Sequence, residues 1–293
     1  MAQAATEGNA PFRYHEISDT EFEYLRDLIY REAGINLTPQ KKLLAQTRLG
    51  KLMRRRNISG YEELFSMIQD DKSGLALEMV IDAISTNHTF FFREDAHFKL
   101  LNEEIIPDIL SKKKTNKQLI RLWSAGCSSG EEPYTAIITF LEAQRNKLIP
   151  PDTQLEVVGT DISKEILDKA AAGLYPAEVV ENLDYNLKKK YFQKGRGSYH
   201  KYVRIKPSVN EKVTFRRHNL LFPFSDFGMF DIIICRNVMI YFDQQTKQKV
   251  LDNMLQSMHT DSFLIIGHSE SLNNIRHSLK TYRPTIFRPK EGF

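Results

Sequence analysis

The chain has 293 residues, of which 41% are hydrophobic and 27% are charged, and its net charge is +4. This composition is typical of a globular protein, argues against disorder and membrane spans, and is too mildly basic to indicate nucleic-acid binding. The amino terminus has no secretory signal pattern, and Cys127 and Cys235 have neither metal-ligand nor disulfide spacing. We therefore expect a protein of the reducing cytoplasm.

Residues 12–85 are predicted to form a helical domain. The first helix begins at the cap signal Ser18-Asp19 and ends at Gly34, where a left-handed conformation is favourable. A second helix opens at Thr38-Pro39, and residues 57–69 and 74–85 have the periodicity of two further amphipathic helices.

The second helix is basic, because residues 41–56 contain seven Lys or Arg and no acidic residue. Four of these cations are spaced so that they share one helical stripe: Lys41, Arg48, Lys51 and Arg55. Such a stripe is a candidate surface for an acidic helix, and a solvated surface face is the competing interpretation.

From residue 95 onward the pattern alternates between helices and short apolar strands. Helices are predicted at 95–113, at 131–147, from Ser163 and at 244–259, and strands at 119–124, 155–161, 213–217, 230–235 and 262–267. This order predicts a doubly wound, parallel α/β sheet with right-handed crossovers. Residues 279–288 are predicted to add one closing antiparallel strand, and residues 174–212, which break the alternation, are interpreted as an inserted subdomain.

Polar or glycine residues follow four of the predicted parallel strands, where ligands of open α/β sheets bind. They are the loop from Gly126 to Gly130, Asp161, Asn219, and the run from Arg236 to Asp243. The glycine spacing departs from G-x-G-x-x-G, which disfavours a NAD site. Asp161 could accept hydrogen bonds from the ribose of an adenosine ligand, and a helix cap is the alternative.

Residues 86–93 contain three consecutive phenylalanines, which cannot all face one helical stripe. We therefore predict that this segment threads a domain interface, where ligand pockets are common. His88 is interpreted as a packing or surface residue without a role in chemistry.

Five motifs, spread over nearly the whole chain, form the most specific signal in the sequence. They are Asn87-His88-Thr89 with Phe91-Phe92-Arg93, Ser128-Ser129-Gly130-Glu131-Glu132-Pro133-Tyr134, Gly159-Thr160-Asp161-Ile162, Asn219-Leu220, and Cys235-Arg236-Asn237-Val238-Met239-Ile240-Tyr241-Phe242. In this order they resemble the CheR-type glutamate O-methyltransferases of chemotaxis receptors.

The resemblance implies a Rossmann-like, S-adenosylmethionine-dependent methyltransferase domain at 98–293, with a small β subdomain inserted at 174–212. It also implies an all-helical substrate-recognition domain at 12–85 and a linker at 86–97 that contributes to the cofactor site. The residues that it places around the cofactor are Asn87, Thr89, Arg93, Glu131, Asp161, Asn219, Leu220, Arg236 and Asn237. Arg93 and Tyr241 are implied to steer the reacting carboxylate, and no metal is expected.

The implied reaction is attack of a receptor glutamate on the methyl group of S-adenosylmethionine, which gives a glutamate 5-O-methyl ester and S-adenosylhomocysteine. A glutamate with a pKa of about 4.3 is ionised at neutral pH, so no general base is needed. The implied partners are the cytoplasmic helical domains of chemotaxis receptors, contacted through the basic stripe. Some family members also bind a receptor carboxyl-terminal peptide at the inserted subdomain, and the sequence leaves open whether this chain does. We expect a monomer with no nucleic-acid partner and no membrane insertion.

Two other functions compete with this interpretation. A nucleic-acid methyltransferase would use the basic helix on phosphates, but the Asn/Asp-Pro-Pro-aromatic motif for exocyclic amines is replaced by Arg236-Asn237-Val238-Met239. A binding module that only senses the cofactor is the second alternative, and the presence of Arg93 and Tyr241 argues against it.

Overall fold

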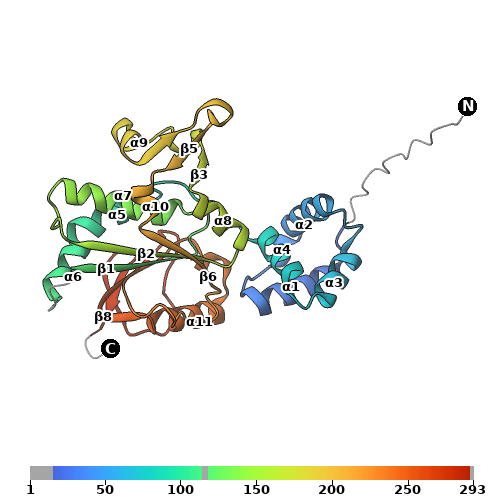
Figure 1. Ribbon diagram of the computed structural model, residues 1–293. Coiled ribbons are helices and arrows are strands. Elements are labelled where there is room, and N and C mark those ends of the chain that lie inside the picture. The colour runs from blue at the N-terminus through green and yellow to red at the C-terminus, as the bar shows by residue number, and fades with distance from the viewer. Residues whose placement is uncertain (1–15, 114–117, 291–293) are drawn as a thin grey trace, which may run out of the picture. The chain divides into compact units, whose positions relative to one another are not determined.

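The structure, a computed structural model, describes residues 16–113 and 118–290. Residues 12–15 and 291–293 of the predicted domains lie outside this description. The chain divides into a helical unit, described for residues 16–32 and 36–85, and an α/β unit formed by residues 33–35 and the described chain from Thr86 onward (Figure 1). No helix in the described ranges is both long enough and apolar enough to cross a bilayer.

The helical unit contains α1 (Asp19–Ala33), a short 3-10 turn η1 (Pro39–Lys41), α2 (Lys42–Arg56), α3 (Tyr61–Asp70) and α4 (Leu75–Ile84). A reciprocal capping box begins α1, because Glu21 N–H donates to Ser18 Oγ (3.2 Å) and Ser18 N–H donates to Glu21 Oε2 (2.7 Å). Leu25, Leu49 and Leu64 are fully buried in its core. The predicted all-helical domain is therefore confirmed.

The α/β unit is built on a seven-stranded sheet in the order β6-β2-β1-β7-β8-β10-β9. The first five strands in this order are parallel to their neighbours: β6 (Val213–Arg217), β2 (Gln154–Asp161), β1 (Leu119–Ala125), β7 (Phe230–Cys235) and β8 (Met258–Ile266). The doubly wound sheet predicted from the sequence is confirmed. Strand β8 begins at Met258 rather than at residue 262, because the preceding helix ends at Leu255.

The single closing strand predicted at 279–288 is wrong. This segment forms a hairpin of β9 (Leu279–Arg283) and β10 (Ile286–Pro289), in which β10 lies between β8 and β9 and is antiparallel to both. The hairpin turns at Pro284-Thr285, and Thr285 takes a left-handed φ of 62° that the loose alternation of the sequence does not reveal.

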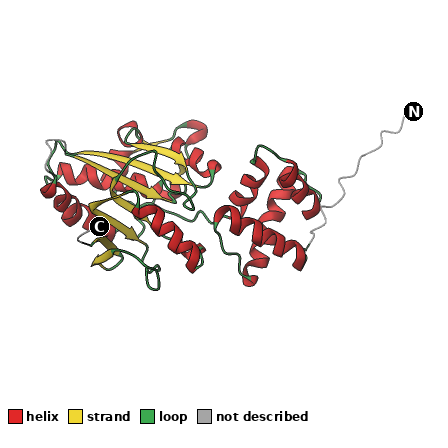
Figure 2. Ribbon diagram, turned by 90° about the horizontal axis from the view of Figure 1, so that it is seen from below, coloured by secondary structure: helices red, strands yellow, loops and turns green. Residues whose placement is uncertain are grey.

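Helices cover both faces of the sheet (Figures 1 and 2). Alternate residues of β7 show this: Ile232 and Ile234 join the core cluster that contains residues of α7, whereas Ile233 and Cys235 join the cluster that contains residues of α11. Burial on both faces explains why the parallel strands are continuous apolar runs. Outside the inserted subdomain, the α-helices of this unit are α5 (Ala96–Leu100), α6 (Ile106–Lys112), α7 (Glu131–Arg145), α8 (Lys164–Ala172) and α11 (Gln244–Leu255), and the π-helical turn η2 (Leu101–Ile105) joins α5 to α6.

Trp123, the sole tryptophan of the chain, lies inside this sheet. It is 1% exposed, its indole N–H donates to Thr160 Oγ1 (2.9 Å), and its ring packs against Phe224 and Phe230. The contact to Thr160 joins β1 to β2 near their carboxyl ends.

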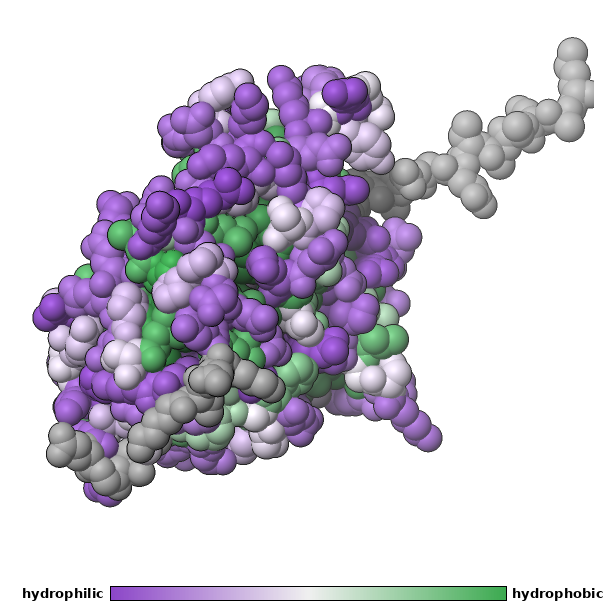
Figure 3. All heavy atoms as spheres, turned by 60° about the vertical axis from the view of Figure 1, so that its left-hand side comes forward, coloured by the Kyte–Doolittle hydropathy of each residue, from purple (hydrophilic) through white to green (hydrophobic). Residues whose placement is uncertain are grey.

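The inserted subdomain contains β3 (Leu174–Pro176), η3 (Ala177–Val180), α9 (Tyr185–Tyr191), β4 (Phe192–Lys194), η4 (Gly197–Tyr199), β5 (Tyr202–Ile205) and α10 (Pro207–Asn210). Its three strands form a separate antiparallel sheet in the order β3-β5-β4. Phe91 anchors the subdomain, since its ring contacts the rings of Tyr175 and Phe192 edge-on at 5.1 Å. The surface at the top of Figure 3, where the subdomain lies, is mostly hydrophilic.

Candidate functional site

The candidate site lies at one edge of the large sheet, where four neighbouring parallel strands end. Strands β6, β2, β1 and β7 are adjacent, and their register pairs Asp161 with Arg217 and Ala125 with Thr160. The residues that follow these strands therefore lie along a common edge. The sequence-predicted polar residues Asn219, Asp161 and Asn237 and the glycine loop are among them.

Asp161 joins the loops that follow β1 and β2. It is 8% exposed, its Oδ2 accepts from Ser128 N–H (2.9 Å), and its Oδ1 accepts from Ser163 N–H (3.1 Å). Ser163 caps α8, because its Oγ accepts from Ile166 N–H (3.2 Å). The alternative role predicted for Asp161, the cap of this helix, thus belongs to Ser163.

The loop after β1 turns tightly at Gly126, which has a φ of +75°. A Cβ at this position would lie 2.5 Å from Val238 Cγ2, so only glycine fits beside the segment that follows β7. Beside this loop, the strand-end carboxylate of Asp161 and the amides of Asn219 and Asn237 offer hydrogen-bonding groups of the kind that hold an adenosine-containing ligand. The residues present therefore fit such a ligand.

The segment from Asn87 to Glu94 belongs to the α/β unit and is attached to this edge. Ser128 Oγ donates to the carbonyl of Asn87 (3.2 Å), and Thr135 Oγ1 accepts from Phe92 N–H (3.1 Å). These bonds place the predicted residues Asn87, Thr89 and Arg93 on a segment that runs beside the glycine loop. Of the three phenylalanines, Phe91 is buried in the core and Phe90 is 46% exposed.

Arg93 is half-buried and closes its own segment into a loop. Its guanidinium donates to the carbonyl of His88 (2.9 Å) and lies 5.8 Å from the centre of the Phe90 ring. These two contacts already engage the side chain of Arg93 within its own segment.

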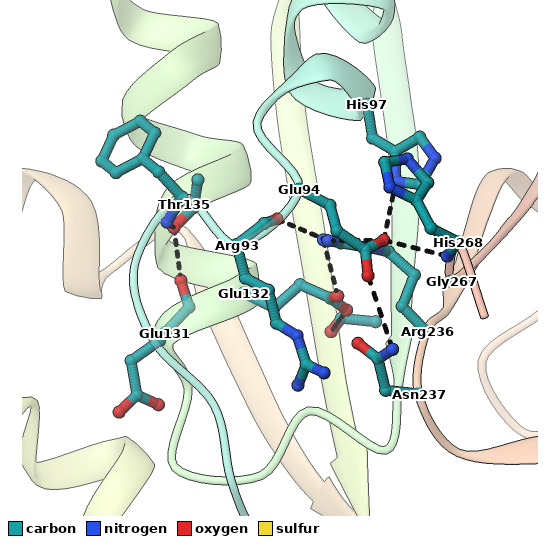
Figure 4. A network of polar contacts seen from close by, with 12 residues as sticks. Arg93, Glu94, His97, Glu131, Glu132, Thr135, Arg236, Asn237, Gly267 and His268 are labelled. Carbon is teal, nitrogen blue, oxygen red and sulfur yellow. Dashed lines mark hydrogen bonds and ion pairs between the residues drawn. The ribbon is translucent and has the colours of Figure 1, made fainter. Parts of the chain in front are cut away.

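Arg236 lies at the centre of a buried ion-pair network (Figure 4). Its side chain is 2% exposed and pairs with Glu94 Oε2 (3.2 Å) and Glu132 Oε2 (3.2 Å). It also donates to the carbonyl of Arg93. The structure thus places this predicted cofactor-site residue beneath the segment that carries Arg93 and Glu94, which it holds in place.

The two carboxylates of this network have opposite pKa shifts. Burial raises the pKa of Glu132, and Arg236 and the hydroxyl of Ser124 offset only part of that effect. Burial alone would raise the pKa of Glu94 too, but Arg236 and the backbone N–H of His268 together hold it below its usual value. Glu94 is therefore the firmly ionised partner of Arg236.

The other predicted cofactor-site residues have varied surroundings. Glu131, at the start of α7, points away from the network (Figure 4); its carboxylate accepts from Ser129 Oγ (2.7 Å), and burial raises its pKa. Asn219 Oδ1 accepts from Leu221 N–H (3.1 Å), and Leu220 is 9% exposed in the core. Tyr241 is half-buried at the end of the short turn η5 (Met239–Tyr241), which follows β7.

Glu94, His97 and His268 bring three possible metal-ligand atoms within 4.8 Å of one another. The pKa of His97 is lowered to about 4 by burial, with Arg236 and His268 adding to the effect. Oε2 of Glu94 already accepts from Arg236 and from His268 N–H (3.2 Å). A cation would have to compete with the arginine for this oxygen, so we assign the group to the ion-pair network.

The predicted basic stripe divides into two pairs, and its first residue, Lys41, lies in the turn η1 rather than in α2. Lys51 and Arg55 are exposed. Lys41 and Arg48 are half-buried, and they donate to the carbonyls of Asn36 and Ile84, within the helical unit. Two of the four predicted recognition residues thus have structural contacts, and the other two remain presented to solvent.

Sequence reasoning missed three acidic residues that organise this edge: Glu94, Glu132 and Glu270. The first two directly follow Arg93 and Glu131, which the motifs singled out. Glu270 stands shortly after the buried parallel strand β8, and the strand-end rule used for β2 and β7 could have identified it.

Comparison with known proteins gives matches along most of the chain. Residues 20–85 match the family described as "CheR methyltransferase, all-alpha domain", and residues 87–287 match "CheR methyltransferase, SAM binding domain". The "Chemotaxis protein methyltransferase" of Borreliella burgdorferi is 37% identical, covering 93% of this chain and 95% of that protein. "Chemotaxis protein methyltransferase 1" of Pseudomonas aeruginosa is 35% identical (88% and 92%), and the Escherichia coli "Chemotaxis protein methyltransferase" is 31% identical (92% and 91%).

Proposed function

We propose that this chain, which belongs to the CheR methyltransferase family, transfers the methyl group of S-adenosylmethionine to glutamate side chains of chemotaxis receptors. The family match shows an S-adenosylmethionine-dependent methyltransferase. The observation that supports a working site most strongly is the sheet edge where Asp161 ends β2, and where Asn219 and Asn237 follow β6 and β7. The products would be glutamate 5-O-methyl esters and S-adenosylhomocysteine.

Methyl transfer at this site can be catalysed by correct positioning of the cofactor and the substrate carboxylate alone. The cofactor supplies an activated methyl group, and a glutamate with a pKa of about 4.3 is already an ionised nucleophile at neutral pH. Arg93 and Tyr241 would orient the carboxylate towards the methyl group. The contacts of Arg93 with His88 and Phe90 suit this role, because a fully engaged ion pair would make the carboxylate less nucleophilic.

The decisive experiment is a methyl-transfer assay with labelled S-adenosylmethionine and three possible acceptors: receptor fragments, nucleic acid and no acceptor. Label that appears in the receptor fragment and is released by mild alkali indicates carboxyl methyl esters. Label in nucleic acid would instead favour the phosphate-binding alternative, and cofactor binding without transfer would favour a sensing module.

Replacing Asp161 with Ala is expected to weaken the binding of S-adenosylhomocysteine. Losing a charge-assisted hydrogen bond to the ribose removes about 1.5–3 kcal/mol of binding free energy, or roughly 10- to 150-fold in Kd. Isothermal calorimetry on the folded variant measures this loss. Ser163→Ala, which removes the cap of α8 but keeps the carboxylate, serves as the control, and an unchanged Kd for Asp161→Ala would remove Asp161 from the site.

Reversing the two exposed cations of the predicted stripe, Lys51→Glu with Arg55→Glu, is expected to raise the KM for receptor fragments and to leave cofactor affinity unchanged. Exposed charges act mainly on encounter and are screened by salt, so the effect should shrink between low and high ionic strength. The double variant Lys72→Glu with Lys280→Glu serves as the control, because it makes the same change in net charge at other exposed positions. Normal methylation at low salt by the α2 variant would contradict recognition through this surface.

The inserted subdomain offers a second contact with receptors. A groove of about 750 Å³ is lined by apolar residues, among them Val180, Phe192 and Val203, and by three cations and two carboxylates: Lys188, Lys189, Lys194, Glu178 and Glu181. Within the described chain, β4 pairs on one side only, with β5. We propose that the carboxyl-terminal peptide of a receptor adds a strand along β4 and places its carboxylate near these lysines.

A synthetic peptide with the last residues of a receptor from the same organism is expected to bind the wild-type protein. Binding should weaken severalfold in Lys189→Glu with Lys194→Glu, because the carboxylate then meets negative charge. Fluorescence anisotropy of a labelled peptide measures the Kd, and an amidated peptide serves as the control. Equal binding of the free acid and the amide would contradict capture of the carboxylate by the lysines.

A further inference from the structure

Glu270 binds the backbone of the segment that carries Asn237 and Tyr241. Its Oε2 accepts from Asn237 N–H (2.8 Å) and from Gly267 N–H (2.7 Å), and its Oε1 accepts from Met239 N–H (2.7 Å). The residue is only 8% exposed. One carboxylate therefore satisfies three backbone donors at the point where the chain leaves β7 and β8, where N–H groups are costly to leave unpaired.

The backbone that Glu270 holds turns sharply at Asn237. Asn237 has a left-handed φ of 60°, which asparagine adopts more readily than most residues, and its N–H is one of the three that the carboxylate binds. The chain then enters η5, in which Tyr241 N–H donates to the carbonyl of Val238 (3.1 Å). Fixing Asn237 and Met239 thus determines where this turn begins and where it presents Tyr241.

A second observation, the absence of a side chain at residue 267, supports this arrangement. A Cβ at Gly267 would lie 2.8 Å from Nδ2 of Asn237 and 2.9 Å from Oε2 of Glu270. The carboxylate reaches the loop after β7 only because this position is glycine. The same loop is tied to the 87–94 segment, since Arg236 pairs with Glu94 and Nδ2 of Asn237 lies 3.5 Å from Oε1 of Glu94.

We propose that Glu270 is a positioning residue for methyl transfer: its carboxylate fixes the loop after β7, so that Asn237 is held for the cofactor and Tyr241 for the substrate carboxylate. This inference rests on the proposed function for the role of Tyr241. The expected effect of Glu270 on cofactor binding depends only on the cofactor site and not on the identity of the substrate. Glu270 touches neither reactant and acts through the backbone of its neighbours.

The test compares Glu270→Gln with the wild type in two measurements that need no receptor. Glutamine keeps the shape but replaces one carboxylate oxygen with an NH₂ group that faces a backbone donor. We expect faster hydrogen exchange at the amides of Asn237 and Met239 and a Kd for S-adenosylhomocysteine about tenfold higher. With receptor fragments, kcat should fall more than KM rises, and Glu270→Asp should recover part of both losses.

The control is Glu104→Gln, which removes the negative charge that pairs with Arg283 and accepts from Tyr282 elsewhere in the same unit. It should lower the midpoint of thermal unfolding and leave the Kd unchanged. A folded Glu270→Gln protein with wild-type Kd and kcat overturns the proposal, as does an equal loss of affinity in the control. If Glu270→Gln does not fold, Glu270→Asp is measured in its place. Faster hydrogen exchange at residues 237–239 of that variant, together with a wild-type Kd for S-adenosylhomocysteine, overturns the proposal. Weakened cofactor binding without receptor methylation by the wild type would contradict the proposed function and the role of Tyr241, and it would leave the effect of Glu270 on the cofactor site standing.

Discussion

Replacing Arg236 with Gln is expected to lower the free energy of unfolding of the α/β unit by about 3–5 kcal/mol. The substitution leaves Glu94 and Glu132 without their shared cation in a buried site. For a unit of this size, such a loss lowers the unfolding midpoint by roughly 6–20 °C. Differential scanning calorimetry measures the change.

The loss should also depend on pH. Burial raises the pKa of Glu132, so this carboxyl takes up a proton more readily as the pH falls, and the unpaired charge disappears. The destabilisation by Arg236→Gln should therefore be smaller at pH 5 than at pH 8. Arg283→Gln breaks the half-exposed pair with Glu104 and should cost at most about 1 kcal/mol. Equal midpoints for Arg236→Gln and the wild type would contradict a stabilising network.

Tyr241→Phe is expected to lower kcat about 10- to 100-fold and to leave the Kd for S-adenosylhomocysteine nearly unchanged. The phenol would donate a hydrogen bond to the reacting carboxylate, and such bonds to charged groups contribute about 1.5–3 kcal/mol. Arg93→Ala should lower kcat and weaken cofactor binding, because the residue lies on the segment attached to the cofactor edge. Steady-state kinetics with receptor fragments and calorimetry measure the two quantities.

The double variant shows whether Arg93 and Tyr241 act together. If both orient one carboxylate, the combined loss in kcat should be smaller than the product of the single losses. Tyr282→Phe removes a hydroxyl that donates to Glu104 away from this edge, and it should keep the wild-type kcat. A wild-type kcat for Tyr241→Phe would exclude its hydroxyl from the reaction.

The sheet and its ligand edge could be predicted from the sequence because both follow from local rules. Apolar runs buried on two faces mark parallel strands, and the residues after them must meet at one edge. That rule identified Asp161, Asn219 and Asn237 correctly as neighbours of strand ends. The hairpin at the far edge was missed because its turn, at Pro284-Thr285, lacks the Asn-Gly or Gly-X signal of a tight turn.

The interaction partners of long charged side chains could not be predicted from such local rules. Arg236 directly follows the apolar strand β7, and nothing next to it in the sequence marks its partners Glu94 and Glu132, which are 142 and 104 positions away in the chain. Arg48 has the spacing of a surface stripe, but it reaches the carbonyl of Ile84 at the end of another helix. Helical periodicity gives the direction in which a side chain leaves its helix and does not say what tertiary structure it meets.

The buried position of Trp123 gives the protein a built-in optical probe. The chain has no other tryptophan, and this one packs between aromatic rings with its indole N–H bonded to Thr160. Excitation at the red edge of protein absorbance excites only this tryptophan, so its fluorescence reports on the α/β unit alone. Tyrosine fluorescence and the helical circular dichroism signal also report on the amino-terminal helices. Comparing the two signals during denaturation separates the melting of the α/β unit from that of the helical unit without any label.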